Sequence, residues 1–245
     1  MANSFFSFKS FTVHQDKAAM KVCTDACLFG AWTALHTLKP DTQHILDIGT
    51  GTGLLSLMLA QFTSAKIDAV EIDENAAIQA KENFNKSPWK EQLFVHHQSL
   101  EDYTGGQQKK FDLIICNPPF FENQLKSIQN DRNLAMHSQQ FSLNLLAGSM
   151  AGLLSDNGIG AVLLPYQRSS EWLTTAQKNQ LTVFRSCSVK QTQDHPFFRS
   201  MFLLHKTAII SKTAPTEIRE EISIKMGPDY SPEFKTILKP YYLAF

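Results

Sequence analysis

The apolar residues of the chain fall into short continuous runs that alternate with segments in which apolar residues recur at helical spacing. The predicted strands occupy residues 44–48, 66–71, 93–97, 111–116, 158–165, 181–184 and 201–204, and the predicted helices include residues 54–60, 74–80, 141–154 and 169–177. This alternation predicts an α/β fold with a seven-stranded, mostly parallel sheet and helices on both faces. The segment from Tyr103 to Lys110, with its two adjacent glycines, is predicted to be a surface loop.

A glycine-rich turn, Asp47-Ile-Gly-Thr-Gly-Thr-Gly53, directly follows the first of these strands. Glycines allow a ligand to approach the backbone closely, and the first amides of the following helix are free to bind polar ligand atoms. We therefore expect a cofactor to lie across this turn. A dinucleotide-binding fingerprint would require glycine where Leu54 stands, which argues against NAD. The predicted contacts are Asp47, Gly49, Thr50, Gly51 and Gly53.

Two later strand ends add candidate cofactor contacts. Glu71 ends the second strand about twenty residues after the glycines, where a carboxylate can bind both ribose hydroxyls. Glu71 could instead cap the next helix, but Asp73 is better placed as the N-cap, so Glu71 and the adjacent Ile72 are assigned to the cofactor. Ser99 and Leu100, after the third strand, are expected beside an adenine, although an ordinary loop would look the same.

The tetrapeptide Asn117-Pro-Pro-Phe120 follows the fourth predicted strand. Each proline restricts the residue before it to extended backbone angles, so Asn117 and Pro118 are held stiffly. Pro118 and Pro119 lack an N–H, which leaves the Asn117 side-chain oxygen and the Pro118 carbonyl as acceptors without a competing donor. This turn suits a planar amine with two N–H donors, and Phe120 is expected to stack on its ring. Considered alone, the tetrapeptide would also suit a rigid turn after a strand.

The glycine turn and this acceptor turn together predict a methyltransferase. Two acceptors outside the ring plane favour a more tetrahedral amine, whose lone pair then points at the donor methyl. The predicted cofactor is S-adenosyl-L-methionine and the predicted substrate is the exocyclic amine of a base. The assigned catalytic residues are Asn117, Pro118, Pro119 and Phe120.

Further segments give the chain a family resemblance over nearly its whole length. They comprise residues 11–16 and 19–32 before the glycine turn, residues 117–121 and 132–137, and residues 230–234 and 241–245 near the C-terminus. The chain resembles the class I S-adenosylmethionine-dependent methyltransferases, and among them the bacterial tRNA adenosine N6-methyltransferases that modify adenosine 37, 3′ of the anticodon, in a valine tRNA. The resemblance implies a Rossmann-like fold and a tRNA substrate.

The same resemblance implies that the leader, residues 1–40, lies close to cofactor and substrate. Within Lys21-Val-Cys-Thr-Asp25 it places Lys21, Thr24 and Asp25 beside the cofactor. A solvated cation at Lys21 and a helix cap at Thr24 are the alternatives for two of these residues.

Composition is compatible with this function without selecting it. The 245 residues, 43% of them apolar, can bury a substantial core, and a single domain over 1–245 is the simplest expectation. We expect a cytoplasmic protein without a membrane span, because no signal-like start or apolar stretch of about twenty residues is present. The four cysteines and eight histidines show no metal-binding spacing, so we predict reduced thiols and no metal.

The formal net charge is zero, but the charges are distributed unevenly along the chain. Residues 185–212 carry a net charge of +4. This predicts that RNA approaches the side built by the later strands and the N-terminal arm, with Lys190 and Arg199 as candidate RNA-binding residues. A solvated charged face is the alternative.

Two other functions also fit these motifs. An N-methyltransferase acting on an rRNA guanine, a DNA adenine or a protein glutamine would use the same acceptors. A non-catalytic RNA-binding module with the same fold would not need an intact glycine turn, Glu71 and acceptor turn, so we consider it the weaker alternative.

Overall fold

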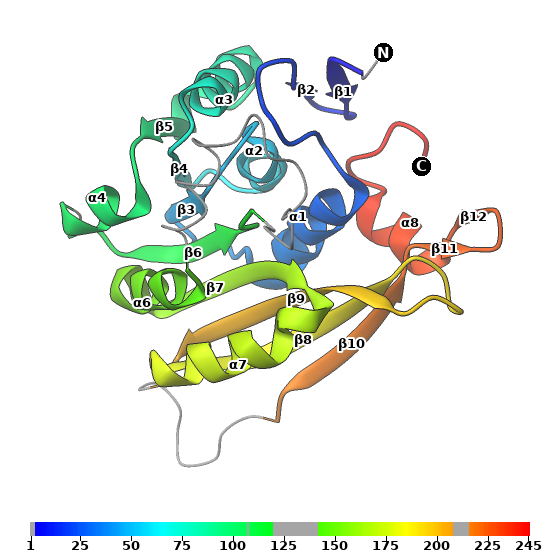
Figure 1. Ribbon diagram of the computed structural model, residues 1–245. Coiled ribbons are helices and arrows are strands. Elements are labelled where there is room, and N and C mark those ends of the chain that lie inside the picture. Colours follow the sequence, from blue (N-terminus) through cyan, green and yellow to red (C-terminus); the bar gives the residue numbers. More distant parts are fainter. Residues whose placement is uncertain (1–2, 107, 120–141, 208–215) are drawn as a thin grey trace, which may run out of the picture.

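The computed structural model describes residues 3–106, 108–119, 142–207 and 216–245, and its centre is an eight-stranded sheet (Figure 1). The strand order is β10-β8-β9-β7-β6-β3-β4-β5. The strands are β3 (His44–Ile48), β4 (Lys66–Glu71), β5 (Leu93–His97), β6 (Phe111–Cys116), β7 (Leu154–Pro165), β8 (Leu181–Lys190), β9 (Phe197–Lys206) and β10 (Ile218–Ser223). Pairing is parallel throughout except at β9, which is antiparallel to both neighbours. The predicted mostly parallel sheet is confirmed, with eight strands instead of seven.

β10 is the strand that the prediction lacked. Its sequence, Ile-Arg-Glu-Glu-Ile-Ser, contains three charged residues, and only Ile222 is buried. The strand lies at the edge of the sheet, parallel to β8, where a side of the strand can remain polar. A search for apolar runs therefore does not find it.

Seven α-helices accompany the sheet within the described ranges. They are α1 (Thr24–Thr37), α2 (Leu54–Ala60), α3 (Glu74–Lys86), α4 (Leu100–Gly105), α6 (Leu143–Leu153), α7 (Ser169–Lys178) and α8 (Pro232–Leu238). The loop predicted from Tyr103 to Lys110 is wrong at its start, because Tyr103 belongs to α4 and is buried. The side chain of Asp73 accepts a hydrogen bond from the Ala76 N–H, which confirms Asp73 as the N-cap of α3.

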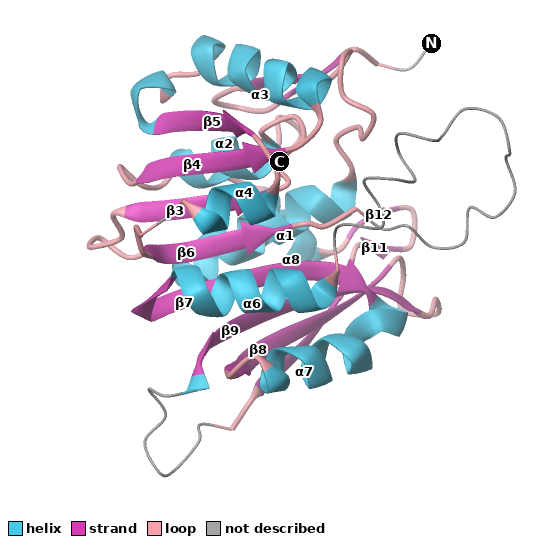
Figure 2. Ribbon diagram, turned by 60° about the vertical axis from the view of Figure 1, so that its left-hand side comes forward, coloured by secondary structure: helices cyan, strands magenta, loops and turns pink. Residues whose placement is uncertain are grey.

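The helices cover opposite faces of the sheet, as Figure 2 shows. Successive strand residues alternate between two apolar clusters: Ile45 faces α1, α2, α3 and α8, whereas Leu46 faces α4, α6 and α7. Both faces of the central strands are thus buried, which explains why these strands read as continuous apolar runs.

Short elements near the two termini pack against each other. The hairpin of β1 (Phe5–Ser7) and β2 (Thr12–His14) is followed by the leader segment, and the hairpin of β11 (Lys225–Met226) and β12 (Asp229–Tyr230) precedes α8. The Lys9 N–H donates to the Tyr241 carbonyl at 2.8 Å, and the Phe6 and Tyr242 rings lie 5.8 Å apart. The N-terminal hairpin is therefore attached to the C-terminal end of the chain.

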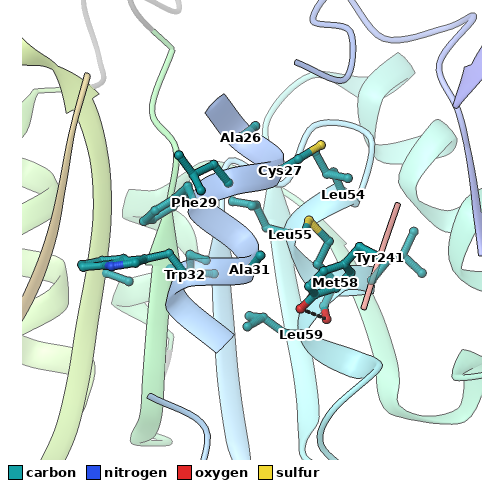
Figure 3. Close-up of a cluster of buried hydrophobic side chains, with 14 of the residues drawn as sticks. Ala26, Cys27, Phe29, Ala31, Trp32, Leu54, Leu55, Met58, Leu59 and Tyr241 are labelled. Carbon is teal, nitrogen blue, oxygen red and sulfur yellow. Dashed lines mark hydrogen bonds between the residues drawn. The ribbon is translucent and has the colours of Figure 1, made fainter. Parts of the chain in front are cut away.

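Helix α1 packs closely on α2 (Figure 3). A Cβ on Gly30 would lie 2.8 Å from the Met58 sulfur, so glycine allows the two helices to approach. On the other side of α1, Trp32 is fully buried and its indole N–H donates to Glu220 of β10 at 3.0 Å. No helix in the described ranges is long and apolar enough to cross a membrane.

We predict that Trp32→Ala lowers the free energy of unfolding by about 3–5 kcal/mol, because it leaves a large cavity and removes a hydrogen-bond donor to the half-buried Glu220 carboxylate. Leu35→Ala, on the same helix at a residue that is 65% exposed, is the control and should change this free energy little. Urea unfolding of both variants measures the difference. A loss at Trp32 no larger than that at Leu35 would contradict the prediction.

Candidate active site

The carboxyl ends of β3, β4 and β6 bring the main predicted site residues together. Ile48 is in register with Val70 on one side and with Cys116 on the other. Gly49 and Asn117 are therefore the next residues on two adjacent parallel strands, which lie about 4.8 Å apart. The predicted glycine turn and the predicted acceptor turn are neighbours in the structure.

The glycine turn has the backbone conformation that its sequence predicts. Gly49, Gly51 and Gly53 all have positive φ angles, of 70°, 57° and 83°. A Cβ on Gly49 or Gly51 would meet no atom within 4 Å, whereas a Cβ on Gly53 would lie 2.5 Å from the Phe84 ring. The first two glycines therefore border open space that a ligand can use, and Gly53 is needed for packing against α3.

Asp47 is a fully buried carboxylate beneath this turn. Its Oδ2 accepts hydrogen bonds from the hydroxyls of Thr50 at 2.6 Å and Ser56 at 2.7 Å. Its Oδ1 is buried and has no hydrogen-bond partner within the described part of the chain. Burial raises the pKa of Asp47 to about 6, although the two hydroxyls oppose this effect. The Thr50 side chain therefore stabilises the glycine turn internally, through its hydrogen bond to Asp47.

Glu71 ends β4 beside the glycine turn. Its Oε2 accepts from the Gly51 N–H at 2.8 Å and its Oε1 accepts from the Asp73 N–H at 3.0 Å. Burial raises the pKa of this carboxyl, while the backbone donors lower it. An ionised carboxylate has about four acceptor positions, so two hydrogen bonds leave Glu71 able to accept from hydroxyl donors.

The described part of the acceptor turn, Asn117 to Pro119, lies outside any helix or strand, directly after β6. The Asn117 side-chain oxygen is buried and has no hydrogen-bond partner among the described residues. Pro118 is buried and Pro119 is half-buried. Phe120 lies outside the described residues, so its predicted stacking role stays a prediction.

The residues expected near an adenine lie at the ends of β4 and β5. The Gln98 N–H donates to the Glu71 carbonyl at 3.0 Å, which brings the β5 end beside the ribose candidate. The side chain of Ile72 is 37% exposed next to it. The Ser99 hydroxyl, at the N-cap of α4, is bonded to Asp102, and Leu100 is buried in the apolar cluster, which makes their backbone groups the main candidates for ligand contact.

Asn83 is a buried residue that the sequence analysis missed. Its side-chain oxygen accepts from the His14 N–H, and its side-chain nitrogen donates to the carbonyls of His14 and Thr52. The Lys17 N–H likewise donates to the Gln79 side chain. Helix α3 therefore ties the leader to the glycine turn. The sequence signal was a pair of polar residues, Gln79 and Asn83, on the buried face of that helix.

The leader residues assigned by resemblance have other partners for their side chains. The exposed Lys21 ammonium donates to the Gln15 carbonyl. Helix α1 begins at Thr24, one residue after its N-cap, so the cap alternative for Thr24 is wrong. Asp25 accepts from the Arg199 Nε at 2.7 Å. Figure 3 shows the start of α1 beside the start of α2, which places the backbone of this segment near the glycine turn.

The basic segment has fewer uncompensated charges than its sequence indicates. Arg185 pairs with Glu220, Lys190 lies 3.7 Å from a Glu221 oxygen, and Arg199 pairs with Asp25. A pocket of about 530 Å³ lies at the same edge of the sheet, and both positively and negatively charged residues line it. It is lined by Lys190, Gln193, Glu221, Ser223, Lys225, Met226, Ser231, Pro232 and Glu233, and by none of the predicted cofactor residues.

The residues at the glycine turn fit S-adenosylmethionine. Its ammonium and ribose hydroxyls are hydrogen-bond donors, and the turn offers the unpartnered Asp47 oxygen and the Glu71 carboxylate as acceptors. The open space beside Gly49 and Gly51 admits a ligand close to the backbone. The described residues contain no group of three or more histidine, cysteine or acidic side chains that could hold a metal ion.

The fold and these residues define a methyltransferase whose methyl donor is S-adenosylmethionine, and residues 23–142 match the model of the methyltransferase small domain family. Two relatives, from Cytophaga hutchinsonii and Parabacteroides distasonis, are 39% and 40% identical to the chain, and each alignment covers 99% of both proteins. Both are named tRNA1(Val) (adenine(37)-N6)-methyltransferase. The chain belongs to this family.

A solved structure supports the fold independently. A predicted O-methyltransferase from Agrobacterium tumefaciens superposes with a TM-score of 0.66 at 12% identity, covering 87% of this chain and 95% of that one. Similarity at this identity concerns the fold alone.

Alanine substitutions at Gly53 and Gly51 should have different effects on stability and on cofactor affinity. We predict that Gly53→Ala lowers the free energy of unfolding by at least about 2 kcal/mol, because it combines a left-handed conformation with a clash against Phe84. Gly51→Ala should lower it by only about 1–2 kcal/mol and should weaken S-adenosylmethionine binding instead. Chemical unfolding and calorimetric titration measure the two effects. Equal stability losses with unchanged cofactor affinity at Gly51 would contradict this division.

The raised pKa of Asp47 predicts a pH-dependent effect on stability. The ionised carboxylate destabilises the folded state, and this effect is absent below about pH 4 and fully present above about pH 6. Relative to the parent, Asp47→Asn should therefore gain up to about 3 kcal/mol of unfolding free energy between pH 4 and pH 8. Urea unfolding across this range tests it. A difference that stays constant with pH would exclude a raised pKa at Asp47.

Proposed function

We propose that the protein transfers the methyl group of S-adenosylmethionine to the N6 amine of adenosine 37 in a valine tRNA, in the cytoplasm where its tRNA is found. The names of relatives that align over nearly the whole chain support this substrate. The observation that carries the chemistry is the buried, unpartnered side-chain oxygen of Asn117 beside the glycine turn.

In this proposal the glycine turn and the adjacent strand ends hold the cofactor. Glu71 accepts from the ribose hydroxyls, and the Asp47 oxygen faces the ammonium end. Ile72 packs on the adenine, whose edge meets the backbone at Ser99 and Leu100. The backbone of Gly49, Thr50, Gly51 and Gly53 forms the floor, and Lys21, Thr24 and Asp25 of the leader lie near the cofactor.

The acceptor turn positions the base. The Asn117 side-chain oxygen and the Pro118 carbonyl each accept one hydrogen of the N6 amine, which localises the nitrogen lone pair toward the donor methyl. When bound, S-adenosylmethionine supplies an electrophilic methyl on its sulfonium. The N–CH₃ bond forms as the S–CH₃ bond breaks, the bonding electrons remain on sulfur, and the amine proton passes to solvent. Pro119 keeps the turn stiff, and Phe120 is proposed to stack on the base.

Lys190 and Arg199 remain proposed RNA contacts, and the lengths of their ion pairs support a difference between them. The Arg199 Nε lies 2.7 Å from an Asp25 oxygen, so its proposed role is to hold the start of α1. Lys190 lies farther from its acid, at 3.7 Å, and is better able to reach a phosphate. We therefore expect Lys190 to contribute more to RNA binding than Arg199.

The test is to incubate the protein with labelled S-adenosylmethionine and unmodified valine tRNA. We predict label at N6 of adenosine 37 and none in a tRNA carrying guanosine there. Asn117→Ala should lower the single-turnover rate at least about a hundredfold, because the lost acceptor acts mainly in the transition state. Its cofactor affinity should be unchanged, and exposed Asn85→Ala serves as the matched control.

The outcomes separate the alternatives. Label in rRNA, DNA or a glutamine peptide, with none in tRNA, would reject this substrate and retain the amine mechanism. Near-parental transfer by folded Asn117→Ala would reject the mechanism. Absence of transfer to every substrate, with RNA binding intact, would identify a non-catalytic RNA-binding module.

A further inference from the structure

An aromatic pair, formed by the exposed Tyr166 and the half-buried Phe197, lies at the same end of the strands as the acceptor turn. Tyr166 directly follows β7, in the short 3₁₀ turn η2 (Tyr166–Arg168), and is 40% exposed. Its ring lies 5.1 Å from that of Phe197 at the start of β9, with an interplanar angle of 35°. The Lys190 ammonium lies 5.2 Å from the Phe197 ring centroid on the β8 side. The cluster thus combines two aromatic rings with a cation.

The register of the sheet places this pair close to the acceptor turn. Cys116 is opposite Val162 on the adjacent parallel strand β7. Pro165, the residue before Tyr166, therefore lies roughly 7 Å beyond the level of Asn117 along the strand direction. A nucleotide next to one whose base occupies the acceptor turn would be within reach of Tyr166.

The backbone that carries Tyr166 is fixed. The Ser169 hydroxyl donates to the Tyr166 carbonyl at 2.7 Å and lies 2.8 Å from the Ser200 hydroxyl on β9. Arg168 makes two hydrogen bonds to Glu171 on α7. Contacts with β9 and with the first turn of α7 therefore fix the backbone of this turn. The ring of Tyr166 is exposed to solvent on a segment that is already ordered before RNA binds.

We propose that Tyr166, backed by Phe197, is a stacking platform for an unpaired base that flanks the target adenosine. This inference rests on the proposed RNA substrate. An enzyme that takes one base out of its stack leaves the neighbouring base with an uncovered face, and an aromatic side chain can cover it. Lys190 beside the platform favours a polyanion over an apolar protein partner.

The test compares Tyr166→Ala with Tyr166→Phe in equilibrium binding to a fluorescein-labelled anticodon stem-loop RNA. Loss of the ring should weaken binding about fivefold to a hundredfold, whereas Tyr166→Phe should keep the affinity within about twofold, because the stacking face survives. Phe94→Ala is the matched control: Phe94 is 41% exposed on the opposite edge strand β5 and should not affect binding. Equal losses in the alanine and phenylalanine variants, or no loss in either, would overturn the platform.

Abasic RNAs show which flanking base stacks on Tyr166. The same variants are titrated with RNAs that lack the base on the 5′ or the 3′ side of adenosine 37. We expect the Tyr166→Ala defect to disappear in one of these RNAs, since its stacking partner is gone. A defect that persists in both would overturn the proposal.

Binding and methyl transfer are measured separately, so two failures can be distinguished. The first outcome is that the Tyr166→Ala defect depends on one flanking base while the parent protein does not methylate the RNA. This outcome would refute the proposed reaction and support the platform. The second outcome is that the parent protein methylates adenosine 37 but the Tyr166→Ala defect does not depend on a flanking base. This outcome would refute the platform alone. A parent that binds no RNA would refute both.

Discussion

The structure depends on the parallel register of β3 with β4 and β6. Because Ile48 lies opposite both Val70 and Cys116, three segments that are far apart in sequence end at one level of the sheet. A shift of one residue would turn the alternating apolar residues to the wrong faces, and both faces are buried. The cores that fix the register therefore also fix the separation between the glycine turn and Asn117. The position of Asn117 beside the glycine turn is a consequence of packing on both sides of the sheet.

The site concentrates polar groups whose burial is only partly compensated. Asp47 has two hydroxyl donors on one oxygen and none on the other, and Asn117 has a buried oxygen without a partner in the described residues. Such groups destabilise the folded state unless a ligand supplies donors. Asn83, by contrast, uses both its oxygen and its nitrogen in binding the leader and the glycine turn. The buried polar groups that join the leader to the glycine turn are hydrogen-bonded, whereas Asp47 and Asn117, which we propose to meet cofactor and substrate, each keep an oxygen without a partner among the described residues.

The sequence predicted the central half of the fold well because buried parallel strands are continuous apolar runs. The four strands ending at Ile48, Glu71, His97 and Cys116 match their predicted limits. Prediction failed where tertiary position changes the pattern. Half of the residues in the edge strand β10 are charged, and α4 extends to Gly105, into the segment from Tyr103 to Lys110 that was predicted to be a loop. Within the candidate site, local motifs predicted the glycines, Glu71 and Asn117, which the structure brings together, but Asn83 acts through contacts with residues distant in sequence.

Tertiary position also limits what the count of charges along the sequence can predict. The basic segment is compensated by acids from elsewhere: Glu220 and Glu221 lie on the strand that the sequence analysis missed, and Asp25 lies in the leader. With a formal net charge of zero and these pairs in place, long-range attraction contributes little to RNA binding. Affinity and selectivity must then come from short-range contacts to an exposed, unstacked nucleotide. A protein of this charge is suited to a loop whose bases are accessible, and less suited to tracking a duplex by its phosphates.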